Sequence, residues 1–479
     1  MCRRAGARGR QMMRENRGEM ATFVGRDSDH YKLPIHPSDM KDYNQLEAEF
    51  LNLKVKAPTL FPVYGKSKEG GINVMSLFSG CGGMDMGFEG GFIASQKSFA
   101  SMDKMISSRL GDNWVILKKN RFNTIFANDI FTEAGLAWTN YMKRFGTSPE
   151  TYRYDSIVDL VKESEAGFDT FPTQVDIVLG GFPCQDFSVS GKRQGFHSQK
   201  MHDGSQRITD EPSIETRGML YYWMKNVIEV VKPKMFVAEN VKGLVNLANV
   251  KDIITNDFKR ADGDGYFVFP PRILNSSHYG VPQARERVIF IGVRKDALKP
   301  DIRLKLEENP DSPDVTPYPT ITHGDTPDLL PPVTCRDVLY YLPEPHESRD
   351  LSQQTYSKAK FLSNGSQGQI EINMSGLSPT IRSEHHGNIE YRRLSKEHGG
   401  KNIDELLSGM RERRLTPREC ALLQSFPPDY EFVKKTTSGR TRYRVSPSVA
   451  YKMIGNAVPP VMAFRLANRI EYMWDTYFI

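Results

Sequence analysis

The sequence VDIVLGGFPCQDFSVS, which runs from Val175 to Ser190, indicates how the fold is organised. Val175–Leu179 is a short apolar run rich in β-branched residues, and it ends abruptly at Gly180-Gly181. This pattern predicts a buried parallel strand that enters a tight turn. Cys184 follows directly, and open α/β sheets keep their ligand crevice beyond the carboxyl ends of such strands. A lone cysteine is more often an inert buried thiol than a nucleophile, so its neighbours must decide between the two.

Length and composition are those of an ordinary globular protein. The chain has 479 residues, 39% hydrophobic and 25% charged, which allows two or three domains with a sizeable core. Its net charge of +6 is compatible with a polyanionic partner but is weak evidence for one. Five scattered cysteines form no CxxC pair, so we expect no disulfide framework, no zinc site and a reducing compartment. Neither a membrane span nor a secretory signal is expected.

Three further strand ends carry residues suited to a cofactor. Asn73–Phe78 predicts a strand, and the glycine-rich sequence at 79–83 predicts a turn where the backbone can approach a ligand. The glycine spacing does not match the GxGxxG fingerprint of dinucleotide-binding proteins. A second strand, Thr124–Ala127, leads to Asp129, and an acid there can bind the ribose hydroxyls of an adenosine cofactor. Asp155 follows a third short strand, and either acid could instead be a helix N-cap or a surface charge.

A carboxylate and two arginines are expected on the same edge of the sheet as Cys184. One predicted strand ends at Glu239, and another, Val288–Val293, is preceded by Arg285 and Arg287. In a strand these two arginines share one face, where they would lower the pKa of a thiol and could orient a carboxylate. A carboxylate and two arginines near Cys184 favour a nucleophilic cysteine over an inert one.

Four other segments have their own composition. Residues 1–72 show no sustained period and are expected to be an N-terminal extension, whereas residues 93–123 look like an insertion. The polar stretch between 185 and 216 could be a lid over the crevice or an idle surface loop. Residues 294–332 are rich in proline and aspartate, which is the composition of a linker.

The last part of the chain predicts a basic hairpin and three helices. The segment 431–444 interleaves cations with aromatic residues, so it could contact phosphates or be a solvated hairpin. The sequence RRLTPRECALLQSFP predicts a capped helix with Thr416 as N-cap, Pro417 at the first position and Glu419 at the third. Residues 445–479 predict two helices around a Gly-Asn turn, the second of which must pack on a core.

Together these sequences resemble the cytosine-C5 DNA methyltransferase family from Asn73 onward. FSGCGGMDMGFE resembles the first motif of the family, GGFPCQDFSVSGKRQGF the fourth and AENVKGL the sixth. QARERVIFIG resembles the eighth, RRLTPRECALLQSFP the ninth and YKMIGNAVPP the tenth. The resemblance implies an α/β fold, with a Rossmann-like S-adenosylmethionine-dependent methyltransferase sheet and a smaller, mostly irregular or β target-recognition domain. The expected divisions are 1–72 (extension), 73–332 (catalytic), 333–444 (target recognition) and 445–479 (return to the catalytic domain).

The resemblance also implies roles for single residues. Cys184 would attack C6 of a flipped-out cytosine, and Glu239, held by Arg287 and Arg285, would hydrogen-bond or protonate N3. C5 would then take the methyl group of S-adenosyl-L-methionine. The implied cofactor residues are Phe78, Gly80, Gly82, Gly83, Asp129, Ile130, Asp155, Leu220 and Asn456. The implied DNA contacts are Gln185, Ser188, Thr380 and Arg382, with His385 and His386 as further candidate base readers, and no metal is expected.

The implied function is methylation of a specific short sequence of double-stranded DNA, as the protective half of a restriction-modification system. We expect a monomer in the cytoplasm, associated with the nucleoid through DNA, and a cognate endonuclease that acts independently. Two alternatives are an RNA methyltransferase, because a tRNA-modifying branch shares these motifs, and a catalytically inactive DNA-binding relative. The long region 333–444 favours DNA, because sequence readout needs a sizeable recognition domain. Intact Cys184, Glu239 and Arg287 favour an active enzyme.

Overall fold

The structure is a computed structural model. It describes residues 64–183, 201–203, 205, 219–246, 250–263, 265–363, 368–383, 389–436 and 443–478. Most of the expected extension 1–72 and of the stretch 185–216 lies outside these residues. So do the side chains of Cys184, Gln185, Ser188, His385 and His386.

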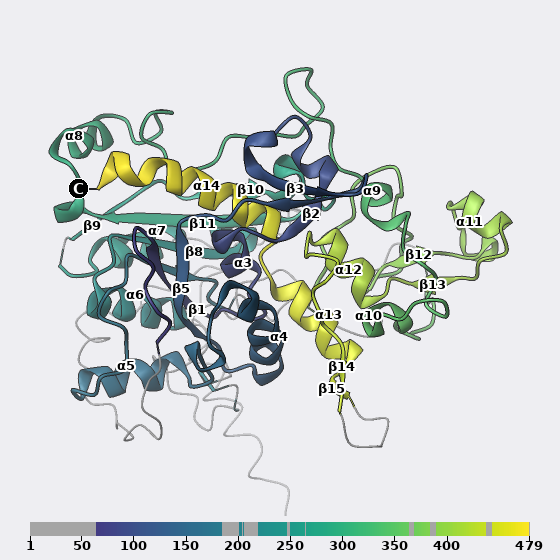
Figure 1. Cartoon of the computed structure of the whole chain (residues 1–479), viewed down its shortest axis with the longest axis horizontal. Coiled ribbons are helices and arrows are strands. Elements are labelled where there is room, and N and C mark those ends of the chain that lie inside the picture. The colour runs from purple at the N-terminus through teal and green to yellow at the C-terminus, as the bar shows by residue number, and fades with distance from the viewer. Residues whose placement is uncertain are drawn as a thin grey trace, which may run out of the picture.

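A mixed sheet, eight-stranded within the described residues, organises the chain (Figure 1). Its order is β10-β11-β8-β7-β1-β5-β6, with β9 paired to β11. Strands β1, β5, β6, β7 and β8 are parallel, and β11 runs antiparallel to β8, β9 and β10. The strands are β1 (Ile72–Leu77), β5 (Phe122–Asn128), β6 (Tyr152–Arg153), β7 (Ile177–Gly180), β8 (Met235–Val241), β9 (Tyr266–Val268), β10 (Arg272–Asn275) and β11 (Glu286–Arg294).

The order of the sheet reverses between β1 and β7. The chain moves outward from β1 through β5 to β6, and then returns to place β7 on the other side of β1. In open α/β sheets, ligands bind beyond the carboxyl ends of the strands at such a reversal. The glycine-rich turn after β1 and the Gly-Phe-Pro-Cys segment after β7 therefore share the expected crevice.

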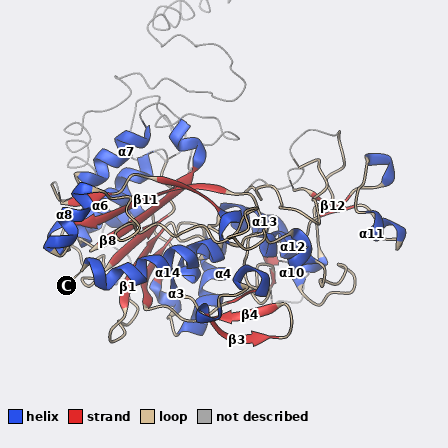
Figure 2. Cartoon of the chain, turned by 90° about the horizontal axis from the view of Figure 1, so that it is seen from above, coloured by secondary structure: helices blue, strands red, loops and turns tan. Residues whose placement is uncertain are grey.

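Helices cover both faces of the sheet, as Figure 2 shows from above. Helices α3, α4 and α14 contribute to one hydrophobic cluster, and α5, α6 and α7 contribute to the other. Along β8 the side chains alternate between them, with Val237 in the first cluster and Phe236 and Ala238 in the second. The helices are α3 (Gly83–Glu89), α4 (Thr132–Met142), α5 (Ile157–Glu165), α6 (Leu220–Val231), α7 (Val250–Lys259) and α14 (Pro460–Tyr477).

The predicted strands of the sheet are confirmed, with one change of length that matters for the site. Strand β8 continues to Val241, so Glu239 lies within the strand and not beyond its end. The cause is β11, which pairs with β8 along its whole length and places Ile289 opposite Glu239. Residues expected at a strand tip are thereby held by a backbone ladder.

The expected insertion forms a small sheet of its own. Strands β2 (Ile93–Ser95), β4 (Trp114–Leu117) and β3 (Ile106–Leu110) pair antiparallel in that order. Val115 and Leu117 of β4 are buried in the cluster that covers α3 and α14. The insertion ends earlier than expected, because β5 already begins at Phe122.

The prediction of a linker at 294–332 is wrong. The segment contains α8 (Pro300–Glu308), and Ile302, Val315 and Tyr318 are buried in the core. The Tyr318 hydroxyl donates a hydrogen bond to the Ile289 carbonyl oxygen at 2.9 Å. Proline lowers the entropy that a chain loses on folding, so a proline-rich segment can also be a packed, irregular one.

The part of the chain after residue 333 has short elements and much irregular structure, as expected. Figure 1 shows β12, β13 and α11 to one side of the main sheet. The predicted helix cap is confirmed, because Thr416 Oγ1 accepts from Glu419 N at 3.0 Å and Glu419 Oε2 accepts from Thr416 N at 2.9 Å. The elements are α9 (Cys335–Leu339), α10 (Leu351–Gln354), β12 (Tyr391–Arg393), α11 (Ile403–Leu407), β13 (Arg413–Arg414), α12 (Pro417–Leu423), β14 (Lys434–Lys435), β15 (Tyr443–Val445) and α13 (Pro447–Asn456).

The division of the chain at 332/333 and 444/445 stays a prediction. Cys420 and Leu422 of α12, inside the expected recognition domain, are buried in the same cluster as Val74 of β1. A shared core of this kind fixes the position of α12 relative to the sheet.

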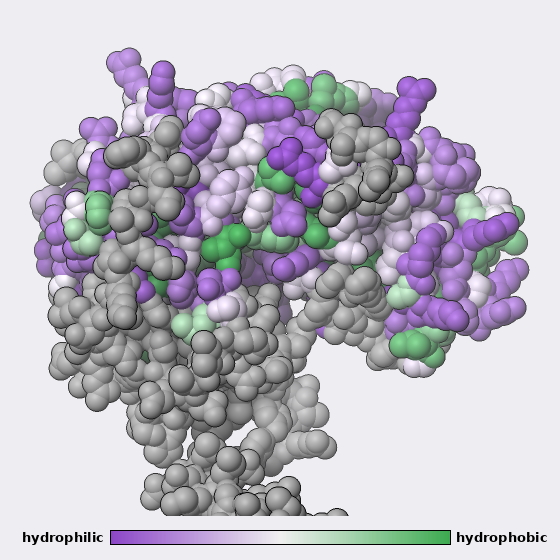
Figure 3. Space-filling view, turned by 90° about the horizontal axis from the view of Figure 1, so that it is seen from below, coloured by the Kyte–Doolittle hydropathy of each residue, from purple (hydrophilic) through white to green (hydrophobic). Residues whose placement is uncertain are grey.

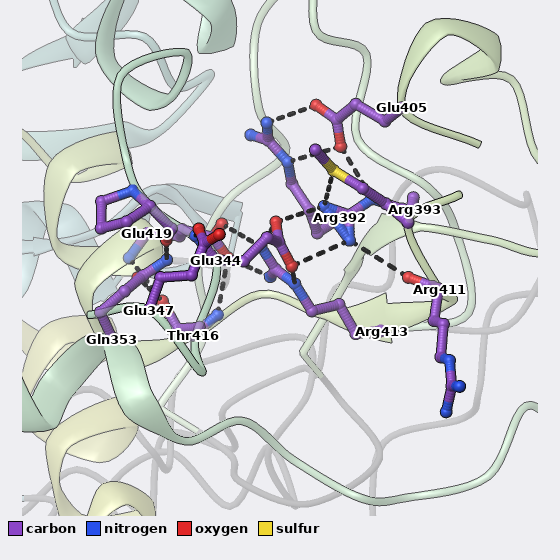
Figure 4. Close-up of polar contacts among 12 residues, drawn as sticks. Glu344, Glu347, Gln353, Arg392, Arg393, Glu405, Arg411, Arg413, Thr416 and Glu419 are labelled. Carbon is purple, nitrogen blue, oxygen red and sulfur yellow. Dashed lines mark hydrogen bonds and ion pairs between the residues drawn. The ribbon is translucent and has the colours of Figure 1, made fainter. Parts of the chain in front are cut away.

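A network of buried ion pairs holds the region around β12 and β13 (Figure 4). Glu344 accepts hydrogen bonds from Arg393 and Arg413, and Arg413 also makes two hydrogen bonds with Glu419, at 2.8 and 2.9 Å. Glu405 pairs with Arg393 at 2.8 Å. Burial acts to raise the pKa of Glu419, but the charge and hydrogen bonds of Arg413 bring it down to about 2.

Replacing Arg413 by methionine should leave Glu419, 1% exposed, without its hydrogen-bonded cation. We expect the free energy of unfolding to fall by roughly 3–5 kcal/mol in urea, the usual cost of breaking a buried pair. Folding lowers the pKa of Glu419 from 4.5 to about 2, so the ionised Glu419 stabilises the folded protein. This contribution to the free energy of unfolding is full above pH 4.5 and is lost as the pH falls toward 2. The variant lacks this contribution. Its free energy of unfolding should therefore fall less than that of the wild type when the pH is lowered from 4.5 to 2.

The control for this test is Arg303→Met, which breaks an exposed pair with Glu307 one helical turn away. Exposed pairs contribute at most about 1 kcal/mol, so we expect a small change. A similar loss in both variants would mean that burial of the Arg413 pair is not what stabilises the region.

Candidate active site

Three neighbouring strands deliver the expected site residues to one edge of the sheet. Leu77 of β1 is paired with Gly180 of β7, and Gly180 is paired with Ala238 of β8. The residues that follow these three positions are Phe78, Gly181 and Glu239, so they lie side by side. The register of the sheet thus fixes the crevice before any side chain is considered.

Glu239 and Arg287 form an ion pair at this edge. The distance from Arg287 Nε to Glu239 Oε1 is 2.7 Å, and both side chains are nearly buried. Burial raises the pKa of Glu239, and the charges of Arg287 and Arg285 offset that rise only in part. The carboxyl group is therefore oriented by Arg287 and holds a proton more readily than an exposed glutamate does.

The Glu239 carboxyl group lies against the segment that leads to Cys184. A Cβ added to Gly181 would come within 3.1 Å of Glu239 Oε2. The Asn240 side chain donates a hydrogen bond to the Phe182 carbonyl oxygen at 3.1 Å and so holds the next residue of that segment. Asn240 was not among the expected site residues, although a polar residue inside a buried strand is a usable signal.

Arg285 has a different set of partners from Arg287. Its guanidinium group is fully buried and donates to the carbonyl oxygens of Ile381 (2.8 Å), Gly455 (2.7 Å) and Ala457 (3.0 Å). Arg287 makes the ion pair with Glu239, and the charge of Arg285 also lowers the pKa of Glu239, so the expected role of Arg285 in holding this carboxyl group stays a prediction. Arg285 joins the start of β11 to Ile381 and to the connection between α13 and α14.

The expected recognition anchor at Thr380-Ile381 is fastened to the same place. The Thr380 hydroxyl donates to the Ala284 carbonyl oxygen at 2.7 Å, and Gln283 Oε1 accepts from Ile381 N at 3.1 Å. The hydroxyl of the half-buried Thr380 is thus used in a hydrogen bond within the chain, whereas Arg382 is exposed to solvent. Gln283, which the sequence did not single out, is fully buried and serves as the anchor point.

The turn after β1 and the acid after β5 meet. Asp129 Oδ2 accepts from Gly80 N at 3.0 Å, and its Oδ1 accepts from Phe131 N at 2.9 Å. Burial raises the pKa of Asp129, and these two N–H groups lower it only in part. On the opposite side, a Cβ added to Gly83 would come within 2.3 Å of the Val458 carbonyl oxygen. The turn is therefore enclosed between β5 and the segment that follows Asn456.

The other expected cofactor residues surround this turn at different depths. Ile130 is 44% exposed beside Asp129, and Asn456 is exposed at the end of α13. Leu220 is buried at the start of α6. Asp155 follows β6 and pairs with Arg153 at 2.9 Å, so part of its hydrogen-bonding capacity is used within the protein.

The described cysteines are poor candidates for a nucleophile. Cys81, Cys335 and Cys420 are buried free thiols. Burial raises the pKa of each, to about 12 for Cys335, which disfavours the reactive thiolate. Among the residues whose placement is described, no cluster of His, Cys, Asp or Glu could hold a metal ion, and no helix could span a membrane.

The strand order, with a glycine-rich turn after β1 and an acid after β5, defines a Rossmann-like methyltransferase fold. The model of the C-5 cytosine-specific DNA methylase family matches residues 72–472, and the chain belongs to that family. The protein is therefore a DNA cytosine-5 methyltransferase, which confirms the resemblance found in its motifs.

Curated relatives match the chain over most of its length. The Type II methyltransferase M.BsuRI of Bacillus subtilis is 32% identical over 418 residues, covering 83% of this chain and 79% of the relative. M.BspRI of Lysinibacillus sphaericus is 32% identical over 426 residues, covering 85% and 84%. M.NgoFVII of Neisseria gonorrhoeae is 30% identical over 413 residues, covering 83% and 86%.

Replacing Gly82 by alanine should damage the site. Its φ of +80° is left-handed, and an added Cβ would lie 2.6 Å from Trp138 Cδ1. Gly146→Ala is the matched control, because φ is +86° there and an added Cβ would meet nothing within 4 Å. Both variants should lose about 1 kcal/mol of unfolding free energy through backbone strain. In an assay that measures transfer of a radiolabelled methyl group to DNA, only Gly82→Ala should lose activity, by at least about tenfold. Equal activities of the two variants would contradict a role for this turn.

Proposed function

We propose that the protein transfers the methyl group of S-adenosyl-L-methionine to C5 of a cytosine in a specific short sequence of duplex DNA. The transfer passes through a covalent bond between Cys184 and C6 of a cytosine flipped out of the helix. The observation that carries this proposal is the buried carboxyl group of Glu239, paired with Arg287 and lying against Gly181, three residues before Cys184.

The turn after β1 fits the cofactor. A Cβ added to Gly80 would meet only Asp129 Oδ2, at 4.0 Å, so the space on that side of Gly80 is open. Each carboxylate oxygen of Asp129 can accept a second hydrogen bond, which suits ribose hydroxyls. The exposed Ile130 offers apolar surface to an adenine ring. S-adenosylmethionine supplies an electrophilic methyl group on a positively charged sulfur, and the nine residues expected from the family would hold it.

The residues of the chain activate the base. Cytosine C5 is a poor nucleophile until a group adds to C6, which is the task of the Cys184 thiolate. The Glu239 carboxyl group, whose pKa is raised, hydrogen-bonds or protonates N3, and Arg287 fixes its orientation. C5 takes the methyl group as the bond from that group to the cofactor sulfur breaks, which leaves a neutral thioether. A base then takes the C5 proton, the C5–C6 double bond re-forms, and Cys184 leaves C6 as the thiolate, which releases the methylated base.

The hydrophilic surface and its exposed lysines are compatible with duplex DNA as the substrate. Hydrophilic residues predominate over the described part of the face seen in Figure 3, and apolar residues there form small separate groups. Lys434 and Lys435 of β14 are exposed on the expected basic hairpin, where they suit phosphate contacts. We place base reading in residues 333–444, with Arg382 as a candidate. Gln185, Ser188, His385 and His386 stay predictions.

We infer a biological setting from the Type II methyltransferases that the chain resembles. The enzyme would protect host DNA in a restriction-modification system, with an endonuclease that acts independently. It would work as a monomer in the cytoplasm, at the nucleoid, because its substrate is there.

Replacing the hydrogen on C5 of the target cytosine by fluorine should trap the enzyme. The final elimination needs the C5 proton, so after methyl transfer the bond between Cys184 and C6 cannot break. We expect a denaturation-resistant complex of enzyme and DNA, mapped by mass spectrometry to the peptide around Cys184, which forms only with S-adenosylmethionine. Glu239→Gln should slow its formation roughly 10²–10⁴-fold, as for a lost acid–base group.

The control variant for the trap is Cys184→Ser, which should bind DNA but form no complex, because a hydroxyl is a far weaker nucleophile at neutral pH. A complex joined through Cys81 or Cys420, or formed without S-adenosylmethionine, would contradict the mechanism. A tRNA substrate that is trapped faster than duplex DNA would show that RNA is the true substrate.

Transplanting residues 333–444 into a related enzyme should transfer the methylated sequence, because base contacts and not phosphate contacts specify a site. Bisulfite sequencing of the host DNA would read the outcome. Exchange of residues 445–479 alone should leave the site of the recipient unchanged. If the recipient kept its own site after the first exchange, the recognition region would lie elsewhere.

A further inference from the structure

A buried polar network lies beneath the turn at 79–83. Asp85 of α3 is fully buried, and its Oδ1 accepts from the Ser76 hydroxyl at 2.5 Å. Its Oδ2 accepts from Trp138 Nε1, also at 2.5 Å. The Ser79 hydroxyl donates to Ser76 Oγ at 2.9 Å, so the network reaches the first residue of the turn. One carboxylate thus connects β1, α3 and α4.

The groups bound to Asp85 support the turn from below. The Trp138 indole lies so close to Gly82 that an added Cβ would come within 2.6 Å of Cδ1. Tyr152 packs against Trp138, with their ring centroids 5.2 Å apart. The Tyr152 hydroxyl donates a hydrogen bond to the Gly80 carbonyl oxygen at 3.0 Å. The positions of Gly80 and Gly82 therefore depend on where Asp85 holds Trp138.

Fold stability alone does not explain why this residue is an acid. An asparagine could accept from Trp138 with its oxygen and donate to Ser76 with its nitrogen, because the Ser76 hydroxyl can rotate. Burial raises the pKa of Asp85 from 3.8 to about 6, although Ser76 and Trp138 lower it. The protonated form of Asp85 is therefore the one that favours the folded state. Its contribution to the free energy of unfolding is full below pH 3.8 and is lost as the pH rises through 6. The ionised acid therefore costs stability at neutral pH, which points to another use of its charge.

We propose that Asp85 is a positioning residue for the cofactor, which it serves through Trp138 and Ser76. Its carboxylate fixes the shape of the turn by charge-assisted hydrogen bonds, which are about twice as strong as neutral ones. Its negative charge, buried beneath the turn, also favours a cofactor that carries a positive sulfur. This inference rests on the proposed binding of S-adenosylmethionine at that turn.

The test measures binding of S-adenosylmethionine to the full chain by calorimetry, together with thermal unfolding. At pH 8, Asp85→Asn should bind about tenfold more weakly, the scale of one lost charge-assisted hydrogen bond, with an unfolding temperature equal to or above that of the wild type. The KM for the cofactor should rise, while kcat at saturating cofactor and the KM for DNA should stay near their wild-type values. Trp138→Phe, which keeps a ring but lacks the N–H, should weaken binding similarly.

The pH dependence separates charge from shape. Cofactor affinity of the wild type should fall as the pH is lowered through 6, and Asp85→Asn should lose that step. The other titratable groups near Asp85 are Glu89 on the same helix, Cys81, Asp129, Tyr152 and Tyr430. Of these, Asp129 also belongs to the expected cofactor site, so Asp129→Asn is measured in parallel. An unchanged step in Asp85→Asn would overturn the role of its charge.

A structural control is Tyr318→Phe, which loses a buried hydrogen bond of the same hydrophobic cluster. It should lower the unfolding temperature and leave cofactor affinity unchanged. Wild-type affinity in Asp85→Asn, with the wild type itself binding, would overturn this inference and leave the proposed function intact. If the wild type bound no S-adenosylmethionine, the assignment of the cofactor and this inference would fall together.

Discussion

The hydrogen bonds of the buried Arg285 guanidinium are the constraint on which the assembly of the molecule depends. They join three carbonyl oxygens that lie 96, 170 and 172 residues away in the sequence. The planar guanidinium carries five N–H donors in fixed directions, so it can donate to three carbonyl oxygens from different segments at once. A cation in the interior is costly, and here carbonyl dipoles offset that cost. Two residues further along the chain, Arg287 of β11 forms the ion pair with Glu239.

Backbone contacts, more than side-chain pairs, set the geometry of the crevice. The ladder between β8 and β11 holds Glu239, the Asn240 amide holds the Phe182 carbonyl, and Asp129 holds the backbone of two turns. Side chains on such a framework lose little freedom when a substrate arrives, and this preorganisation favours catalysis. In residues 333–444, by contrast, side-chain ion pairs around Glu344 connect the segments that contain β12 and β13.

Local patterns predicted the fold well where the cause is local. The β-branched runs of β1, β5 and β7 are buried on both faces, and the cap of α12 needs only Thr416, Pro417 and Glu419. Predictions were wrong or incomplete where a structure depends on contacts with residues far away in the sequence. The length of β8 follows from β11, the packing of 294–332 follows from the core beneath it, and the partners of Arg285 come from segments far along the chain. Within the site, the pairing of Glu239 with Arg287 was expected, whereas Asn240 and Gln283 were not.

The close packing of α14 on α3 also bears on how the enzyme matures during synthesis. A Cβ added to Gly87 of α3 would lie 2.4 Å from the Ala463 side chain, and Phe464 packs edge-on against Phe92 and Phe99. The helix that follows the first turn of the sheet is therefore covered by residues translated more than 370 positions later, since Gly87 and Ala463 are 376 residues apart. Contacts of such long range form late. This face of α3 therefore stays uncovered until residues 460–477 have been synthesised and have left the ribosome.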